Sequence, residues 1–353
     1  MLKRLLTAPL ITVAGALVVA FAPMRADRVE RFFSNGLYPL IQPRLTALSN
    51  LVPFALFDVL LVVAAAVVII RLALGLARFR KEGWRFLVRT GTLAAALYLI
   101  FLAVWGFNYR REPFRRTLPF DQERVTHEAL TQLAARTVDE LNAIYPRLPD
   151  TWPRWNELAT ELEPAFTRAR AVVGPGWRVE IGRPKHSLLN AYFKRTAVDG
   201  MVDPFFLEVL VNQDVLPSER PFIVSHEWGH LAGRADESEA SFLGWLTCMN
   251  GPLWARYSAW VSLYGTILGG LPSDERRTID AQLDAGPRRD LLALSERVAR
   301  QSSVLARRVS EVTYDRFLKA NRLREGVAGY RLVVTLLLGT AIEIPSLESR
   351  PTP

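Results

Sequence analysis

The chain has 353 residues, half of them hydrophobic, with a mean hydropathy of +0.12 and a formal net charge of +9. Residues 1–109 hold 12 Lys and Arg against 4 Asp and Glu, so +8 of this charge lies in the first third of the chain. The rest is nearly neutral, which argues against nucleic acid as a partner. Because Cys248 is the single cysteine, an intramolecular disulfide and a cysteine-ligated zinc ribbon are excluded.

Three apolar runs near the N-terminus have the length of a bilayer crossing, about 20 residues each. They cover about residues 5–23, 51–70 and 90–109. We therefore expect residues 1–109 to form a membrane anchor of three transmembrane helices, with the lipid bilayer as a partner. Lys3 and Arg4 before the first run are also compatible with a cleaved signal peptide, and this alternative stays open.

The distribution of Lys and Arg predicts an orientation for this anchor. Residues 71–89 carry six of them, whereas residues 24–50 carry four, so the later loop is expected to be cytoplasmic. Residues 110–353 then lie outside the membrane. Asp58 falls in the second run, where it is either a functional carboxylate within the bilayer or, as we favour, a residue at the interface.

The periodicity of residues 110–353 is mostly helical. Apolar spacing predicts helices over 125–145 and 155–172, and alternation predicts short strands over 177–181 and 209–211. The apolar run 332–338 is too short to cross a bilayer, so we assign it to the core. The expected fold class is therefore mainly α, with a small β-sheet.

The motif His226-Glu227-Trp228-Gly229-His230 carries the strongest chemical signal. Two histidines four residues apart lie on one face of a helix, so both imidazoles can reach one metal ion. Glu227 is placed to accept a proton from water that the metal activates, and we expect it to act as the general base. Pro221 in the first turn, with Ser218 as a candidate cap upstream, predicts that the motif lies on a helix.

A catalytic zinc ion takes a third protein ligand and leaves a fourth position open. Three acids follow the motif: Asp236, Glu237 and Glu239. A Glu that opens a second helix three residues before an alanine is the gluzincin arrangement, which favours Glu237, whereas the metzincin spacing favours Asp236. We expect Zn²⁺ to be bound by His226, His230 and Glu237, with Glu239 and then Asp236 as alternatives.

Other residues are weaker candidates. Tyr257 is either an oxyanion stabiliser or, as we favour, a packing residue. Glu208 either holds a histidine or the substrate backbone, or is a charge on an edge strand. His127 and His186 have no partner pattern and are assigned to the surface. An extended substrate is expected to pair with an edge strand around residues 209–211.

Beyond the H-E-x-x-H motif, the chain resembles a bacterial family catalogued as domain of unknown function 3810. The resemblance covers nearly the whole chain and rests on the three apolar runs and on these segments: Gly200, Pro204-Phe205, Glu208, Glu237–Phe242, Arg256-Tyr257-Ser258, Tyr314–Asn321 and Gly326-Val327. The family more often has Asp and Asn where this chain has Ser238 and Ser241, and it has a basic residue where this chain has Asp236.

The resemblance implies a membrane-bound, zinc-dependent peptidase. Its zincin-like domain, residues 110–353, would face the periplasm or exterior from the bacterial cytoplasmic membrane. The expected reaction is hydrolysis of a peptide bond in an unidentified protein or peptide. Two alternatives stay open: a non-catalytic zinc-binding membrane scaffold or regulator, and a protein whose histidine pair binds no metal. The sequence does not predict an oligomeric state.

Overall fold

The computed structural model describes residues 2–174, 176–321, 323 and 332–342, and this part of the chain is mainly helical. The elements before the sheet are α1 (Leu2–Phe21), α2 (Ala26–Val29), η1 (Glu30–Leu37), α3 (Tyr38–Asn50), α4 (Leu56–Val104), η2 (Gly106–Arg110), α5 (Phe114–Thr117), η3 (Gln122–Arg124), α6 (His127–Ile144), η4 (Tyr145–Arg147) and α7 (Trp155–Val173). The helices predicted over 125–145 and 155–172 are confirmed by α6 and α7.

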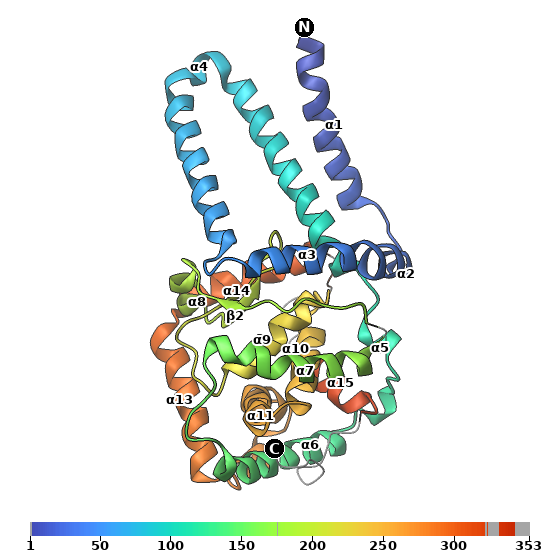
Figure 1. The fold of residues 1–353 in the computed structure, drawn as a ribbon, viewed down its shortest axis with the longest axis vertical. Helices are drawn as coiled ribbons and strands as arrows, with labels where there is room; N and C mark the ends of the chain where they lie inside the picture. The colour runs from blue at the N-terminus through green and yellow to red at the C-terminus, as the bar shows by residue number, and fades with distance from the viewer. Residues whose placement is uncertain (1, 175, 322, 324–331, 343–353) are drawn as a thin grey trace.

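The second half of the chain contains the sheet and the remaining helices. They are β1 (Pro184–Lys185), α8 (Asn190–Thr196), β2 (Gly200–Val202), β3 (Val209–Val211), α9 (Arg220–Leu231), α10 (Glu237–Met249), α11 (Leu253–Leu268), α12 (Ser273–Asp280), α13 (Ala285–Gln301), α14 (Val304–Ala320) and α15 (Leu332–Gly339). In Figure 1, α1 and the two arms of α4 stand at one end of the molecule, and α3 crosses their base. The other elements form a body below α3.

The prediction of three transmembrane helices near residues 5–23, 51–70 and 90–109 is wrong. Within the described residues, no helix combines the length and the apolar character needed to cross a membrane. The second and third runs are not separate helices, because residues 71–89 between them are also helical in α4. The third run ends its helix at Val104, and Trp105 beyond it is buried in the core of the body. Hydropathy along a sequence cannot distinguish such packing from a bilayer crossing.

The predicted boundary at residue 109 divides residues that share one core. Val29, Phe33, Tyr38 and Trp105 come from the first part of the chain, yet they belong to the same buried cluster as residues of α6, α7, α9, α10 and α11. The tyrosine hydroxyl of Tyr38 also donates a hydrogen bond of 3.0 Å to the carbonyl of Leu231, at the end of α9. Residues before position 109 therefore help to hold the motif helix.

Helix α10 lies at the centre of the body. All of its residues are buried, and it packs against α9, α7, α11 and α15. A helix surrounded in this way needs apolar or small residues on every face, which explains why its sequence shows no amphipathic pattern. The apolar run 332–338 forms most of α15, where Val333 and Leu336 are buried, so its assignment to the core is confirmed.

Two glycines allow α9 and α10 to cross at unusually short distance. A Cβ atom added to Gly229 of α9 would lie 2.9 Å from the Cα atom of Ala240. A Cβ atom added to Gly244 of α10 would lie 2.9 Å from the backbone nitrogen of His226. Because these neighbours are backbone atoms, they cannot turn aside as a flexible side chain can. The crossing therefore depends on the two missing side chains.

The sheet has three short strands in the order β1–β3–β2. β3 is parallel to β1 and antiparallel to β2, and all three of its residues are buried. The prediction that residues 209–211 form an edge strand is therefore wrong, because β3 is paired on both sides. No strand forms over residues 177–181, which lie in an irregular segment before β1.

Glu208 and Asp58 fasten the start of α4 to the body. The carboxylate of Glu208 is buried, accepts hydrogen bonds from the backbone N–H groups of Leu56 and Phe57, and lies 2.6 Å from the Nζ atom of Lys185. It therefore caps a helix, and neither role predicted for it is correct. Asp58 accepts hydrogen bonds from Ser187 Oγ and from a backbone N–H, so its carboxylate serves the same attachment.

Replacing Gly244 by alanine tests the helix crossing. The added Cβ atom would force α9 and α10 apart, so we expect the free energy of unfolding to fall by about 1–3 kcal/mol. Gly265 of α11 is the matched control, because no atom in the described part of the chain lies within 4 Å of a Cβ atom placed there. Gly265→Ala should instead stabilise the protein by about 0.5–1 kcal/mol. Denaturant unfolding of both variants measures the difference, and equal stabilities would contradict a close crossing at Gly244.

Candidate metal centre

The H-E-x-x-H motif lies on α9, as the sequence predicts. Pro221 is in the first turn of the helix, but Ser218 does not cap it. Instead, the N–H group of Phe222 donates a hydrogen bond of 3.0 Å to the hydroxyl of Ser258, which belongs to α11. At the other end, Gly233 has a φ angle of +78°, a left-handed conformation that glycine adopts without strain and that ends the helix in a turn.

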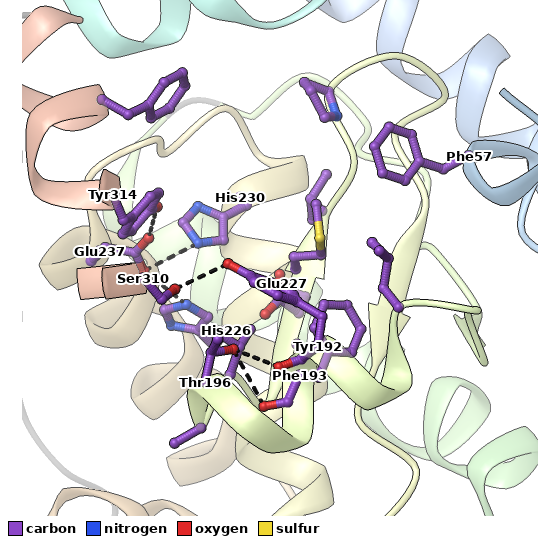
Figure 2. A pocket seen from close by; sticks show the side chains of 18 of the residues that line it. Phe57, Tyr192, Phe193, Thr196, His226, Glu227, His230, Glu237, Ser310 and Tyr314 are labelled. Atoms are coloured by element: carbon purple, nitrogen blue, oxygen red, sulfur yellow. Dashed lines mark hydrogen bonds and ion pairs between the residues drawn. The ribbon is translucent and has the colours of Figure 1, made fainter. Parts of the chain in front are cut away.

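Helix α10 brings a carboxylate to the two motif histidines. Oε2 of Glu237 lies 3.2 Å from Nε2 of His226 and 3.4 Å from Nε2 of His230. One candidate ligand atom from each of the three residues lies within 4.8 Å of the others. Figure 2 shows the three side chains converging at one side of a cavity. Two imidazoles and a carboxylate form the donor set that is typical of a catalytic zinc site.

The other two acids lie elsewhere. Asp236 caps α10, because its Oδ1 atom accepts hydrogen bonds from the N–H groups of Ser238 and Glu239. Glu239 lies 3.2 Å from Nη1 of Arg234 and also accepts a hydrogen bond from the backbone N–H of Phe114. Both carboxylates are therefore used in structural contacts. Of the three candidates, Glu237 is the acid that contacts both histidines.

Hydrogen bonds to the far side of each ring orient the histidines. Nδ1 of His230 lies 2.7 Å from the carbonyl oxygen of Arg234, and because a carbonyl only accepts, Nδ1 must donate. In the neutral ring Nε2 then carries the lone pair that a metal needs. Nδ1 of His226 lies 3.1 Å from Ser241 Oγ, which can hold that ring in the same tautomer. Such contacts increase metal affinity by fixing the ligands.

Tyr314 of α14 completes the surroundings of Glu237. Its hydroxyl donates a hydrogen bond to Oε1 of Glu237, while Oε2 of the same carboxylate faces the histidines. Figure 2 shows Tyr314 beside Glu237. Sequence reasoning assigned Tyr314 no role. The one signal for it was its place in the segment Tyr314–Asn321 that carries the family resemblance.

Tyr257 does not belong to this site. It is fully buried, it packs against Tyr145 and Trp152, and its hydroxyl donates a hydrogen bond of 2.7 Å to Asp290. The favoured interpretation of Tyr257 as a packing residue is therefore confirmed. His127 is exposed and lies beside Glu275, and His186 packs against Trp155, so neither lies near the motif.

The side chain of Glu227 extends from the motif helix α9 toward strand β2 of the sheet. This side chain is buried, and a Cβ atom added to Gly200 of β2 would lie 2.7 Å from Oε1 of Glu227. The glycine therefore leaves the space that the carboxylate occupies. Within the described residues, Oε2 of Glu227 has no hydrogen-bond partner although it is buried. A buried carboxylate oxygen without a partner costs free energy, and such a cost is typical of a functional group.

Burial and mutual charge set the ionisation of the cluster. Burial raises the pKa of Glu227 above its usual range, and the two histidines partly oppose this change. Burial also raises the pKa of Glu237, but the histidines outweigh it and hold that pKa well below its usual range. Burial lowers the pKa of His230, yet Glu237 and Glu227 raise it to about 9. The negative charge that favours a proton on His230 also favours a metal cation at the same place, so the two compete.

The cluster lies at a cavity of about 750 Å³. The walls come from both ends of α4, from η2, α8, β2 and α14, and the motif residues lie on one side (Figure 2). A cavity of this size fits the range of small-molecule and peptide-side-chain sites. The cluster therefore faces a space that a substrate can enter, as a catalytic site requires and a purely structural metal site does not.

Metal binding can be tested with two isosteric substitutions. We expect the protein to bind one Zn²⁺ ion, and Glu237→Gln to weaken that binding by at least about 100-fold because a charged ligand is lost. Asp236→Asn is the matched control, because asparagine caps a helix as well as aspartate does. Its affinity should stay within a few-fold of the unchanged protein. Competition with a chromophoric chelator measures both, and an unchanged protein that binds no zinc would favour the metal-free alternative.

Comparison with known proteins identifies the family. No curated protein and no solved structure matches the chain. A family model described as "Protein of unknown function (DUF3810)" matches residues 33–338, which include the motif helix, α10 and Tyr314. Gly326 and Val327, which also carry the resemblance, lie outside the described residues. Since the match covers most of the sequence, the chain belongs to the family of proteins of unknown function DUF3810.

Proposed function

We propose that this protein is a zinc-dependent peptidase in which His226, His230 and Glu237 bind the metal ion. The observation that carries this proposal is the convergence of these three ligands and the buried Glu227 on one cavity. The residues fit the metal by their donor set, by the hydrogen bonds that orient both rings, and by the partnerless oxygen of Glu227. When bound, zinc supplies a Lewis acid that polarises a carbonyl and makes water more acidic.

Glu227 is the proposed general base. Its carboxylate is held between α9 and β2, on the cavity side of the histidine pair. It accepts a proton from the attacking water and then donates that proton to the amine that leaves when the peptide bond breaks. No donor among the described residues competes for its Oε2 atom, so the carboxylate is not held in a hydrogen bond that would oppose this transfer.

Strand β2 is the proposed site for the substrate backbone. Asn212 N–H donates to the carbonyl of Asp199, and Asp203 N–H donates to the carbonyl of Glu208. In an antiparallel pair, the backbone N–H and C=O groups of successive residues point alternately toward the partner strand and away from it. The backbone groups of Met201 therefore face β3, like those of Asp199 and Asp203. The backbone groups of Gly200 and Val202 point to the outer edge of the sheet. All three residues line the cavity. An extended peptide that pairs with this edge would pass beside Glu227.

Glu227→Gln tests the general base. We expect zinc affinity to stay within a few-fold, because glutamine has nearly the same shape, while hydrolysis of internally quenched peptides falls by about 10²–10⁴-fold. Glu275→Gln changes a carboxylate outside the cavity and should leave the rate unchanged. Full activity of the Glu227→Gln protein would contradict the mechanism. Zinc binding without any hydrolysis by the unchanged protein would favour a non-catalytic regulator instead.

Gly200→Ala tests the position of that base. The new Cβ atom would displace the carboxylate of Glu227, and a shift of about 1 Å costs about 100-fold in rate. We therefore expect kcat to fall by roughly that factor while zinc content stays at one ion per chain. Gly265→Ala again serves as the control, because its Cβ atom meets open space. An unchanged kcat in Gly200→Ala would show that Glu227 does not act from the position seen here.

A further inference from the structure

We infer that the substrate is an extended peptide with large apolar side chains next to the bond that is cleaved, an inference that rests on the proposed function. The cavity beside the metal centre has mainly aromatic and aliphatic walls. The aromatic residues of the wall come from the two ends of α4, from the segment that follows it, and from α8 and α14, namely Phe57, Phe101, Trp105, Tyr109, Tyr192, Phe193, Tyr314 and Phe317. Such walls stabilise an apolar side chain by burying its surface and by ring–ring contact.

The charges that line the cavity are already compensated. Among the described residues of the wall, the charged side chains besides the proposed ligands and Glu227 are Arg307 and Glu311, both on α14. The Nε atom of Arg307 lies 3.7 Å from Oε1 of Glu311, so this pair is internally neutral. A charged substrate side chain would lose its hydration in the cavity and gain no opposite charge. The wall therefore selects against acidic and basic side chains.

The polar groups of the wall also have partners. The hydroxyl of Tyr192 lies 3.0 Å from Ser310 Oγ, and Thr196 Oγ1 donates to the carbonyl of Tyr192 (Figure 2). In each of these contacts one hydroxyl donor is already engaged within the wall, so fewer donors remain for a sugar or another polar ligand. The polar groups available to the substrate are instead those of the outer edge of β2, which suit a peptide backbone. The outer edge of β2 thus favours a peptide backbone, and the cavity wall favours apolar side chains on that peptide.

The cavity wall reaches the surface at α4. Leu61 lines the cavity, and 36% of its surface is exposed. Its neighbour Val62 is 55% exposed but does not line the cavity. A charge at Leu61 would thus change the lining of the cavity, whereas the same charge at Val62 would change the outer surface alone. This pair of adjacent residues supplies a matched test.

Binding is measured with zinc-loaded, full-length Glu227→Gln protein, so that no turnover interferes. The probes are two fluorescent peptides of equal length, one with Phe and Leu at the central positions and one with Asp there. We expect the apolar peptide to bind at least about 100-fold more tightly by fluorescence anisotropy. Adding Leu61→Lys should weaken the apolar peptide about 10-fold and strengthen the Asp peptide, whereas adding Val62→Lys should change neither.

Equal affinity for the two peptides, or equal effects of the two lysines, would overturn the inference. Binding of a fluorescent fatty acid with no binding of either peptide would also overturn it, since the cavity would then take a different apolar ligand. Cleavage of the same peptides by the unchanged protein is measured in parallel. If the apolar peptide binds selectively but remains intact, the proposed function fails and the ligand class stands. If both peptides are cleaved equally, the inference fails and the peptidase stands.

Discussion

The close crossing of α9 and α10 is the constraint on which the candidate site depends. Its distance is set at Gly229 and Gly244, where the facing backbone atoms leave no room for a side chain. The first residue of α10 is Glu237, so the crossing decides how far that carboxylate lies from the histidines one helix away. A metal site needs its ligand atoms placed within a few tenths of an ångström. Two helices held backbone to backbone supply that accuracy better than loops would.

The buried charges around the site divide into two kinds. Arg234 is paired with Glu239, and Lys185 with Glu208, so these ionised groups are compensated where they lie. Arg297 of α13 lies 3.0 Å from Asp199 and 2.6 Å from Glu219, which connects the start of β2 to the start of α9. Those pairs hold elements together. Glu227 differs, because its buried carboxylate forms no ion pair among the described residues and its Oε2 atom lacks a hydrogen-bond donor there, a cost that the fold tolerates at the cavity.

Sequence periodicity predicts much of the centre because its residues are close along the chain. His226 and His230 are one helical turn apart, and Glu237 opens the next helix after the turn at Gly233, so local rules are enough. Tyr314 comes to Glu237 from a helix far along the sequence, and no local pattern predicts such a contact. The same limit explains the wrong edge strand at 209–211, since pairing on both sides of β3 depends on partners that sequence alternation does not show.

Hydropathy failed at the N-terminal runs for a related physical reason. It sums side-chain character along the chain, whereas the end of the third run packs on the body through Phe101 and Trp105. That packing matters for the site: the ring of Trp105 lies edge-on to His230, with centroids 6.2 Å apart.

The other end of α4 is fixed by the carboxylate of Glu208, which accepts a hydrogen bond from the backbone N–H group of Phe57. Both ends of α4 are thus tied to elements that hold the centre, and both also line the cavity. The same contacts at the ends of α4 therefore position both the cavity wall that would select a substrate and the residues that would act on it. The distance and orientation between wall and residues are fixed as a result.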